Sequence, residues 1–304
     1  MIHPFNIKKV ITRLGLVLIL LLLTGYVHAQ EEPLKMATLY LQKGELDSAK
    51  MFINQVITDP QAAKDGNVWY LRGFIYKSIY NKWEKTNKKS PARLEALKSF
   101  KKSFAIDTSN ATLQENKKNI KYLATTLYND AATSLDSMDY KLGIETFDQF
   151  REYYLLIDTS QTNIRQTDVK FLLALASVYT MIFEADKKGK LEFLALAKET
   201  YNKVLTIDAN NITANFNMGI LYYTQAINLI NQLDYGVDLR SLNDAQDNSL
   251  SLFRESLPFM EKAYLLDPNR KETLYGLSGI YFSLNEIDKS NEFKQKLEDI
   301  KKKQ

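Results

Sequence analysis

The sequence predicts an all-α protein built from successive helical hairpins, and three observations support this fold class. Glycine and proline are sparse, with 11 and 6 residues in a chain of 304. Between them, apolar residues recur at three- and four-residue spacing, as Leu97, Phe100 and Phe104 do, which is the period of an amphipathic helix. An apolar residue followed by Asp and a polar turn also recurs five times. We find no alternation of period two, so strands are not expected.

The first element is a secretory signal peptide, assigned to residues 1–29. Basic residues precede an apolar run over positions 14–23, and small residues lead up to Ala29, the order typical of such peptides. An uncleaved anchor is the alternative, but ten apolar residues fall well short of the roughly 20 that span a bilayer. We therefore expect cleavage before Gln30. No cysteine follows the run, so the protein is not expected to be a lipoprotein.

The repeated Asp motif divides the rest of the chain. Its five copies are Ile57–Pro60, Ile106–Ser109, Ile157–Ser160, Ile207–Asn210 and Leu266–Asn269. We interpret each copy as a helix end: the apolar residue closes a buried face, and Asp or Asn is expected to cap the next helix. Proline is tolerated at such a boundary.

Around these motifs the chain resembles the tetratricopeptide repeat (TPR) over essentially all of residues 30–304. One unit places Trp69, Gly73 and Tyr76 on a first helix, with Ala96 and Phe100 on a second. Other units match in part, through Tyr40 with Ala49, Ala131 with Phe147, Tyr179 with Ala197, Gly219 with Met260, and Leu277 with Ile287. The resemblance implies one α-solenoid domain of about six TPR-like helical hairpins.

Several of these hairpins are predicted to be elongated. The Asp residues of the motifs lie 48, 51, 50 and 59 residues apart, whereas the usual unit has about 34 residues. The regular interval of nine residues survives from Tyr40 to Ala49 and from Tyr281 to Ser290. Residues 291–303 are rich in Lys and Glu and are expected to form a polar capping helix.

Composition excludes several classes of function. The signal peptide carries three of the 40 basic residues and none of the 36 acidic ones, which leaves 37 against 36 and a net charge of +1. A charge this close to zero gives no general attraction to nucleic acid, and contact with a membrane is not indicated. His3 and His28 both lie in the signal peptide, and cysteine is absent. Ser-His-Asp and Cys-His catalysis and zinc sites of His or Cys are therefore excluded, and no catalytic residue, metal site or cofactor is assigned.

The resemblance also implies where a partner would bind. In TPR proteins the first helices line the concave face, and the matching positions here are mostly aromatic: Tyr70, Phe74, Tyr128, Phe216, Ile220, Tyr223, Tyr275 and Phe282. Exposed aromatic residues anchor protein interfaces. The alternative is that these side chains pack as core between the elongated hairpins. The Lys, Asn and Arg pattern with which some TPR proteins grip a C-terminal carboxylate is missing, so an apolar or mixed peptide is expected.

Two further patterns have ordinary structural interpretations. Residues 77–121 contain twelve Lys or Arg and four acidic residues, which an acidic partner could contact but which also suits a solvated helix surface. Ser99 and Lys102 have the Ser-x-x-Lys spacing of some serine nucleophiles, without the companion motifs of that chemistry.

The sequence therefore predicts an exported, non-enzymatic scaffold in the periplasm or cell envelope that binds a protein or peptide on the concave face. Two alternatives remain open at this stage. One is a hydrolase that uses only carboxylates on a helical scaffold. The other is a membrane-tethered structural subunit of an envelope complex.

Overall fold

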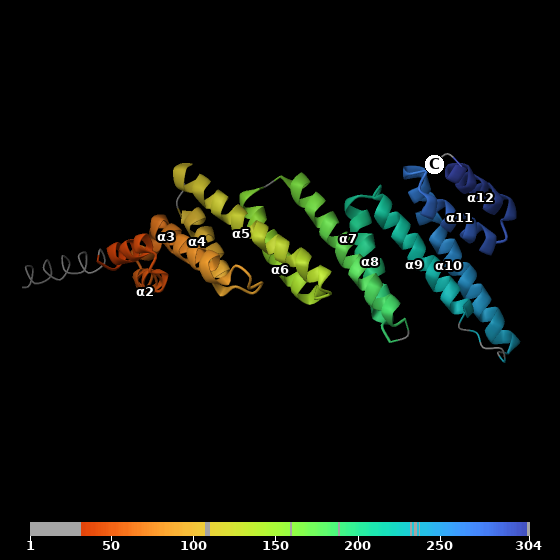
Figure 1. The fold of residues 1–304 in the computed structure, drawn as a ribbon, viewed down its shortest axis with the longest axis horizontal. Helices are drawn as coiled ribbons and strands as arrows, with labels where there is room; N and C mark the ends of the chain where they lie inside the picture. Colours follow the sequence, from red (N-terminus) through yellow and green to blue (C-terminus); the bar gives the residue numbers. More distant parts are fainter. Residues whose placement is uncertain are drawn as a thin grey trace, which may run out of the picture. The chain divides into compact units, whose positions relative to one another are not determined.

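The structure is a computed structural model that describes residues 32–302 apart from positions 107–109, 159, 188, 232, 234–235 and 237. Secondary structure in the described part is helical, without strands (Figure 1). The predicted all-α fold class is thereby confirmed. The predicted signal peptide, residues 1–29, lies outside the described residues.

The two helices of each hairpin are antiparallel neighbours. Their bounds are 32–43, α2 (Leu46–Val56), α3 (Gly66–Ile79), α4 (Pro91–Ile106), α5 (Asn110–Asp136), α6 (Tyr140–Ile157), α7 (Gln161–Ala185), α8 (Leu191–Ile207), α9 (Ile212–Asn231), α10 (Leu239–Leu266), α11 (Lys271–Ser283) and α12 (Ile287–Lys302). Taken in order within the described residues, they form six hairpins, from 32–43 with α2 through to α11 with α12. The chain is thus a TPR-like series of hairpins with the predicted number of units.

Contacts between Cα atoms divide the chain into two compact units. Unit 1 comprises Met1–Ala131 and Ile144–Thr159, and unit 2 comprises Ala132–Gly143 and Ser160–Gln304. Each unit has its own apolar core, which in unit 1 includes the fully buried Leu97. No described helix is both long enough and apolar enough to cross a bilayer.

Three hairpins close through the same tight turn. Gly44, Met138 and Asn285 have φ values of 74°, 62° and 61°, the left-handed conformation that ends many helices. In each turn the N–H of this residue donates to the carbonyl three residues earlier, and the next N–H donates to the carbonyl five residues before it, at 2.8–3.0 Å. This pairing is the Schellman motif. It explains the two intervals of nine residues, and it places the extra residues of the third hairpin at the open ends of α5 and α6.

The second hairpin is lengthened by a π-helix. Residues Tyr80–Glu84 continue α3 with π-helical geometry, a detail that the predicted elongation of the hairpins did not include. The Glu84 carboxylate then accepts hydrogen bonds from the Ser90 hydroxyl at 2.6 Å and from the Ala92 N–H at 3.0 Å. With the Ser90 hydroxyl accepting from the N–H of Arg93 at 3.0 Å, these contacts satisfy the free N–H groups at the start of α4.

Three of the five Asp motifs form turns, and among these only Asp59 also contacts the start of the next helical segment as expected, by accepting from the Ala62 N–H at 2.7 Å. Asp59, Asp208 and Asp267 each accept a hydrogen bond from the backbone N–H two residues later, at 3.1–3.3 Å, which defines an Asx turn. The helix caps come a few residues further on. Asp65 accepts from Asn67 N–H at 2.8 Å before α3, and Asn211 accepts from Ala214 N–H at 3.0 Å before α9.

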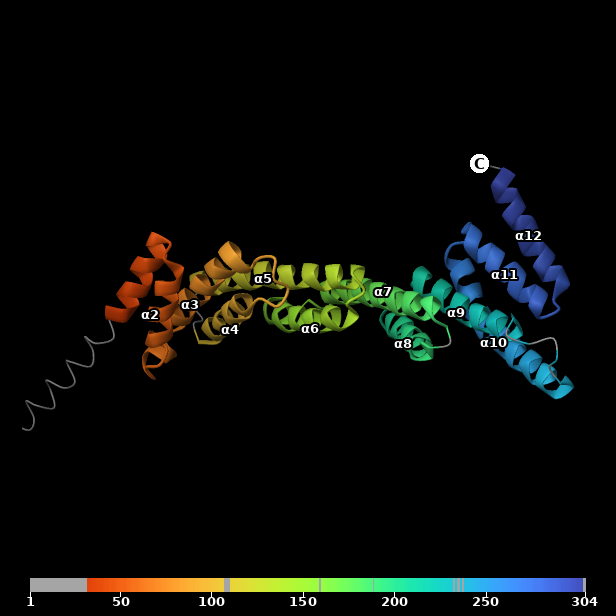
Figure 2. The same cartoon turned by 60° about the horizontal axis from the view of Figure 1, so that its bottom comes forward.

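Small residues let helices approach closely in both units. A Cβ on Gly73 of α3 would lie 2.8 Å from the Phe100 ring of α4. In unit 2, a Cβ on Gly219 of α9 or on Gly276 of α11 would lie 3.0 Å from Met260 Cε. The Met260 side chain of α10 therefore fills the space left by two glycines. Figures 1 and 2 show α9, α10 and α11 as neighbours.

The last helix, α12, has the polar outer side that was predicted. Phe293 and Leu297 are buried against α11, and the Ser290 hydroxyl donates to the Ser278 carbonyl at 2.8 Å. Lys296 and Lys301 form ion pairs with Glu residues three or four positions earlier on the solvent side.

Candidate functional site: an aromatic face on the first helices

Aromatic side chains form matching stripes on α9 and α11, the first helices of two successive hairpins. On α9 the stripe is Phe216, Ile220 and Tyr223, and on α11 it is Tyr275, Gly279 and Phe282. Both have the spacing i, i+4, i+7, which places the three residues on one side of a helix. We call the five side chains other than Gly279 the aromatic face.

The two stripes meet at Gly279. A Cβ added to this glycine would lie 2.9 Å from the Tyr223 hydroxyl oxygen and 3.4 Å from its ring. The missing side chain therefore lets the Tyr223 ring lie against α11, between Tyr275 and Phe282. On its other side the same ring packs on Phe253 of α10, with centroids 5.5 Å apart.

The side chains of the aromatic face differ in solvent exposure: three are partly buried and two are exposed. Phe216, Ile220 and Tyr223 are partly buried and pack against the core of α10–α12. Tyr275 and Phe282 remain 70% and 60% exposed. Rings held open to solvent on a well-packed helix are the arrangement that a partner could cover.

Cations border the aromatic face. The Arg270 guanidinium lies 3.8 Å from the centroid of the Phe216 ring, and Lys294 Nζ lies 5.4 Å from that of Phe282. Burial raises the pKa of Tyr223, and the proximity of Tyr275 raises it further. The Tyr223 phenol therefore stays neutral and available as a hydrogen-bond donor at physiological pH.

The equivalent positions of α3 have a more polar setting. Tyr70 packs edge-on against Phe100 with centroids 5.8 Å apart, and Phe74 is 36% exposed. At the third position stands Lys77, whose Nζ lies 4.4 Å from the Phe74 centroid and donates to the Asn119 side chain of α5 at 2.6 Å. A hydrogen bond thus joins α3 to α5, whereas α9 contacts α11 through the Tyr223 ring.

Tyr128 lies inside its hairpin. Its ring is 5.3 Å from that of Phe150 and 6.2 Å from that of Phe147, both on α6. The eight predicted site residues therefore fall into three settings: the aromatic face of unit 2, the polar α3 surface, and the interior of the third hairpin.

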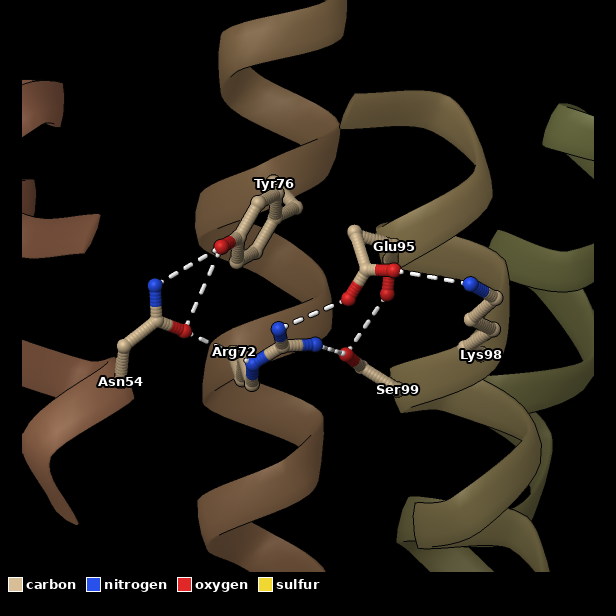
Figure 3. A network of polar contacts seen from close by, with 6 residues as sticks. All are labelled: Asn54, Arg72, Tyr76, Glu95, Lys98 and Ser99. Atoms are coloured by element: carbon tan, nitrogen blue, oxygen red, sulfur yellow. Dashed lines mark hydrogen bonds and ion pairs between the residues drawn. The ribbon is translucent and has the colours of Figure 1, made fainter. Parts of the chain in front are cut away.

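A buried polar network in unit 1 was missed by the sequence reasoning (Figure 3). Arg72 of α3 donates through Nε to Asn54 at 3.0 Å, through Nη1 to Ser99 at 2.5 Å, and through Nη2 to Glu95 at 2.8 Å. Its guanidinium also lies 4.5 Å from the centroid of the Tyr76 ring. One arginine thus joins α2, α3 and α4. The pKa of Glu95 is lowered, because hydrogen bonds and charge from Arg72 and Lys98 outweigh its burial.

A second buried arginine joins the next pair of hairpins. Arg93 of α4 is 1% exposed and donates to Asp130 of α5 at 2.5 Å, to Thr126 at 3.3 Å and to the Lys88 carbonyl at 2.6 Å. The Tyr80 ring covers the guanidinium, 5.4 Å away. Because arginine is rarely buried unless paired, residue type alone gave no signal for either site.

The Ser-x-x-Lys pair has a structural setting. Ser99 is fully buried, accepts from Arg72, and donates its hydroxyl to the Glu95 carbonyl at 2.7 Å. Lys102 is exposed on the same helix. The serine proton is therefore directed to a backbone carbonyl and not to a lysine base. Among the described residues, no group of three His, Cys, Asp or Glu side chains could hold a metal ion.

Comparisons with known proteins find solved structures at low identity and with TM-scores of 0.30 or below for the three described here. No protein-family model and no curated protein matches the sequence. MamA has 11% identity over 90% of this chain and 92% of its own, with a TM-score of 0.29. PilW, a widely conserved type IV pilus biogenesis factor, has 13% identity over 89% and 93%, with a TM-score of 0.30. The TPR domain of P58(IPK) has 12% identity over 90% and 97%, with a TM-score of 0.22. The TPR-like description therefore rests on the hairpins themselves.

Proposed function

We propose that this chain is a non-enzymatic scaffold that is exported through its N-terminal signal peptide and binds a partner protein or peptide on the aromatic face. The observation that carries the proposal is the exposure of Tyr275 and Phe282, at 70% and 60%, on a helix whose opposite side is fully packed. Large rings fixed by a helix bury much area on binding and lose little entropy, which makes them effective anchors.

The chemistry of the aromatic face indicates the kind of partner. Phe216, Ile220 and Tyr223 are half-buried and form the apolar part of the surface, next to the exposed rings of Tyr275 and Phe282. Arg270 and Lys294 lie beside this surface. A segment with apolar residues on one side and polar residues on the other complements this surface, as in the binding of amphipathic segments to apolar grooves. Binding of this kind needs no cofactor.

The binding test compares two double variants of the exported protein. Tyr275→Ala/Phe282→Ala removes the exposed rings. Leu239→Ala/Leu265→Ala removes two leucines of α10 that are 73% and 72% exposed and serves as the matched control. A photoreactive residue placed at position 283, which is partly exposed next to Phe282, would crosslink the partner in the native envelope.

We expect the crosslinked partner to be lost with the aromatic variant and kept with the leucine variant, while circular dichroism shows both to be folded. Unchanged crosslinking by the folded aromatic variant would contradict the proposal. Export is tested separately by sequencing the mature N-terminus. A start at Gln30 supports cleavage, and retention of residues 1–29 would favour a tethered protein.

A further inference from the structure

A cleft on unit 1, independent of the aromatic face, concentrates positive charge. It has a volume of about 370 Å³ and lies between the N-terminal half of α5 and the C-terminal end of α6. Its lining, which we call the basic cleft, consists of Gln114, Lys117, Lys118, Lys121, Tyr154, Ile157 and Asp158. The α5 residues follow the spacing i, i+3, i+4, i+7 and those of α6 the spacing i, i+3, i+4, so each helix contributes one side.

The lysines of the basic cleft are weakly neutralised. The side-chain ammonium groups of Lys117 and Lys121 form no ion pair or hydrogen bond with the described residues, although the Lys121 backbone carbonyl accepts the Thr125 hydroxyl. Lys118 Nζ lies 3.8 Å from Glu115, in a loose pair whose lysine side chain is 78% exposed, and such pairs contribute little. The neighbouring Lys77 responds to this charge: burial lowers its pKa, Glu115 opposes the shift, and Lys118 lowers it further.

The opposite wall offers apolar surface and one carboxylate. Ile157 and the Tyr154 ring supply the apolar part. The Asp158 carboxylate accepts the Tyr154 hydroxyl at 2.9 Å, so it is already engaged on its own side of the cleft. The recess is thus lined by three lysines and one carboxylate, Asp158, beside apolar surface, and Glu115, which is not part of the lining, pairs loosely with Lys118.

We propose that the basic cleft binds an acidic segment of a partner protein, whose Asp or Glu side chains pair with Lys117, Lys118 and Lys121. The spacing of the lysines favours a peptide over one compact phosphate. Lys117 and Lys121 are separated by about 6 Å along the helix axis, at about 1.5 Å per residue, which suits carboxylates distributed along a chain. The flexible methylene stems of lysine and the wall of Tyr154 and Ile157 suit the aliphatic parts of such side chains.

The experiment measures binding of a fluorescein-labelled Asp/Glu-rich peptide to the full mature chain by fluorescence anisotropy, at low and at physiological ionic strength. The Asn/Gln counterpart of the same length is the neutral probe. Lys117→Gln/Lys121→Gln is the test variant. Lys89→Gln/Lys102→Gln is the matched control, because it removes the same charge from exposed lysines of the same unit outside the cleft. Vesicles of phosphatidylcholine and phosphatidylserine test the lipid source.

We expect the acidic peptide to bind with a salt-dependent affinity that falls about tenfold in the test variant, as for the loss of two surface ion pairs, and less than twofold in the control. The neutral peptide should not bind, and Tyr275→Ala/Phe282→Ala should bind the acidic peptide normally. Equal losses in the two lysine variants would overturn the cleft as the site. Binding of the phosphatidylserine vesicles but not of the peptide, lost in the test variant, would overturn the acidic segment as the occupant.

Discussion

Units 1 and 2 use the same hairpin but join their helices by different chemistry. In unit 1 the contacts between successive helices include Arg72 and Arg93, two arginines that are 7% and 1% exposed and bonded to neighbouring helices. In unit 2 Met260 of α10 is fully buried between Gly219 and Gly276, and no charged side chain takes part in this contact; the buried Ser256 hydroxyl donates to the Gly219 carbonyl at 2.7 Å. One fold therefore tolerates both charged and apolar contacts between helices, and in unit 1 the buried guanidinium groups are compensated by acceptors on neighbouring helices.

The difference extends to the surface of the first helices. Between α3 and α5, Lys77 and Asn119 share a hydrogen bond, so the polar groups of that surface are engaged with each other. Between α9 and α11, Tyr223 occupies the space over Gly279 and leaves Tyr275 and Phe282 exposed. In unit 2 the apolar contacts in the core are thus continuous with apolar side chains on the surface of α9 and α11. This is why we propose unit 2 as the unit that binds a partner.

Among the substitutions that test the difference between the two units, removal of a buried cation should change the free energy of unfolding most. Arg93→Met leaves the Asp130 carboxylate facing a methionine, and because the Asp130 side chain is 22% exposed, the cost should lie below the roughly 3–5 kcal/mol of a fully buried pair, at about 2–3 kcal/mol. The double variant Arg93→Met/Asp130→Leu should recover much of this loss, because a well-packed apolar pair can replace a buried ion pair. Recovery of stability in the double variant would show that apolar contacts, like those between the helices of unit 2, can replace the ion pair of unit 1.

The two tryptophans make this effect measurable in one unit. Trp69 and Trp83 are the tryptophans of the chain, and both belong to unit 1. Urea unfolding followed by tryptophan fluorescence therefore reports unit 1, whereas far-UV circular dichroism reports both units. A fluorescence midpoint for Arg93→Met equal to that of the unchanged protein would contradict a structural role for the ion pair.

A matched pair of glycine substitutions, one at a close helix contact in each unit, should change the free energy of unfolding by an intermediate amount. In Gly73→Ala the new methyl would lie 2.8 Å from the fully buried Phe100 ring, and overpacking of a core costs about 1–3 kcal/mol. In Gly279→Ala the methyl meets the hydroxyl end of the half-buried Tyr223. That ring can tilt, and alanine gains about 1 kcal/mol in helix propensity, so the net change should be close to zero.

Urea unfolding of both alanine variants provides the measurement. Equal destabilisation by Gly73→Ala and Gly279→Ala would show that Tyr223 is as rigid as a core ring, and would weaken the view of the aromatic face as adaptable. A serine at position 73 serves as a control, because it should be at least as destabilising as alanine.

Much of the fold could be predicted from the sequence because it depends on local patterns. The interval of nine residues from Tyr40 to Ala49 and from Tyr281 to Ser290 predicted short hairpins, and both close through the same left-handed turn. The π-helix over Tyr80–Glu84 was not predicted, because its residues keep an ordinary helical pattern of apolar positions.

The candidate site was predictable only in part. Helical periodicity identifies the side of a helix that carries Tyr128 or Tyr275, but it does not reveal how far neighbouring helices cover that side. Tyr128 packs on Phe150, whereas Tyr275 remains 70% exposed. The burial of Arg72 and Arg93 depends on acceptors from helices distant in sequence, such as Asn54 for the first, and no local pattern encodes those partners.

The smallest predicted changes in stability concern the left-handed turn, which occurs in both units. Gly44 in unit 1 and Met138 and Asn285 in unit 2 adopt the same left-handed conformation, which costs a residue with a Cβ about 1–2 kcal/mol unless its side chain tolerates it, as Asn does. Glycine loses more chain entropy on folding, so Met138→Gly should stabilise by about 0.5–1 kcal/mol. Gly44→Ala should destabilise by about 1 kcal/mol, with no steric contribution, because nothing lies within 4 Å of its added Cβ.

Urea unfolding followed by circular dichroism would rank the three positions. Asn285→Gly should stabilise less than Met138→Gly, because asparagine visits the left-handed region more readily than methionine. Equal gains at the two positions would mean that the stabilisation does not come from the backbone conformation of Met138. A graded series would instead show that the turn has one backbone requirement in both units, so that the units differ in how their helices are joined and not in how their hairpins close.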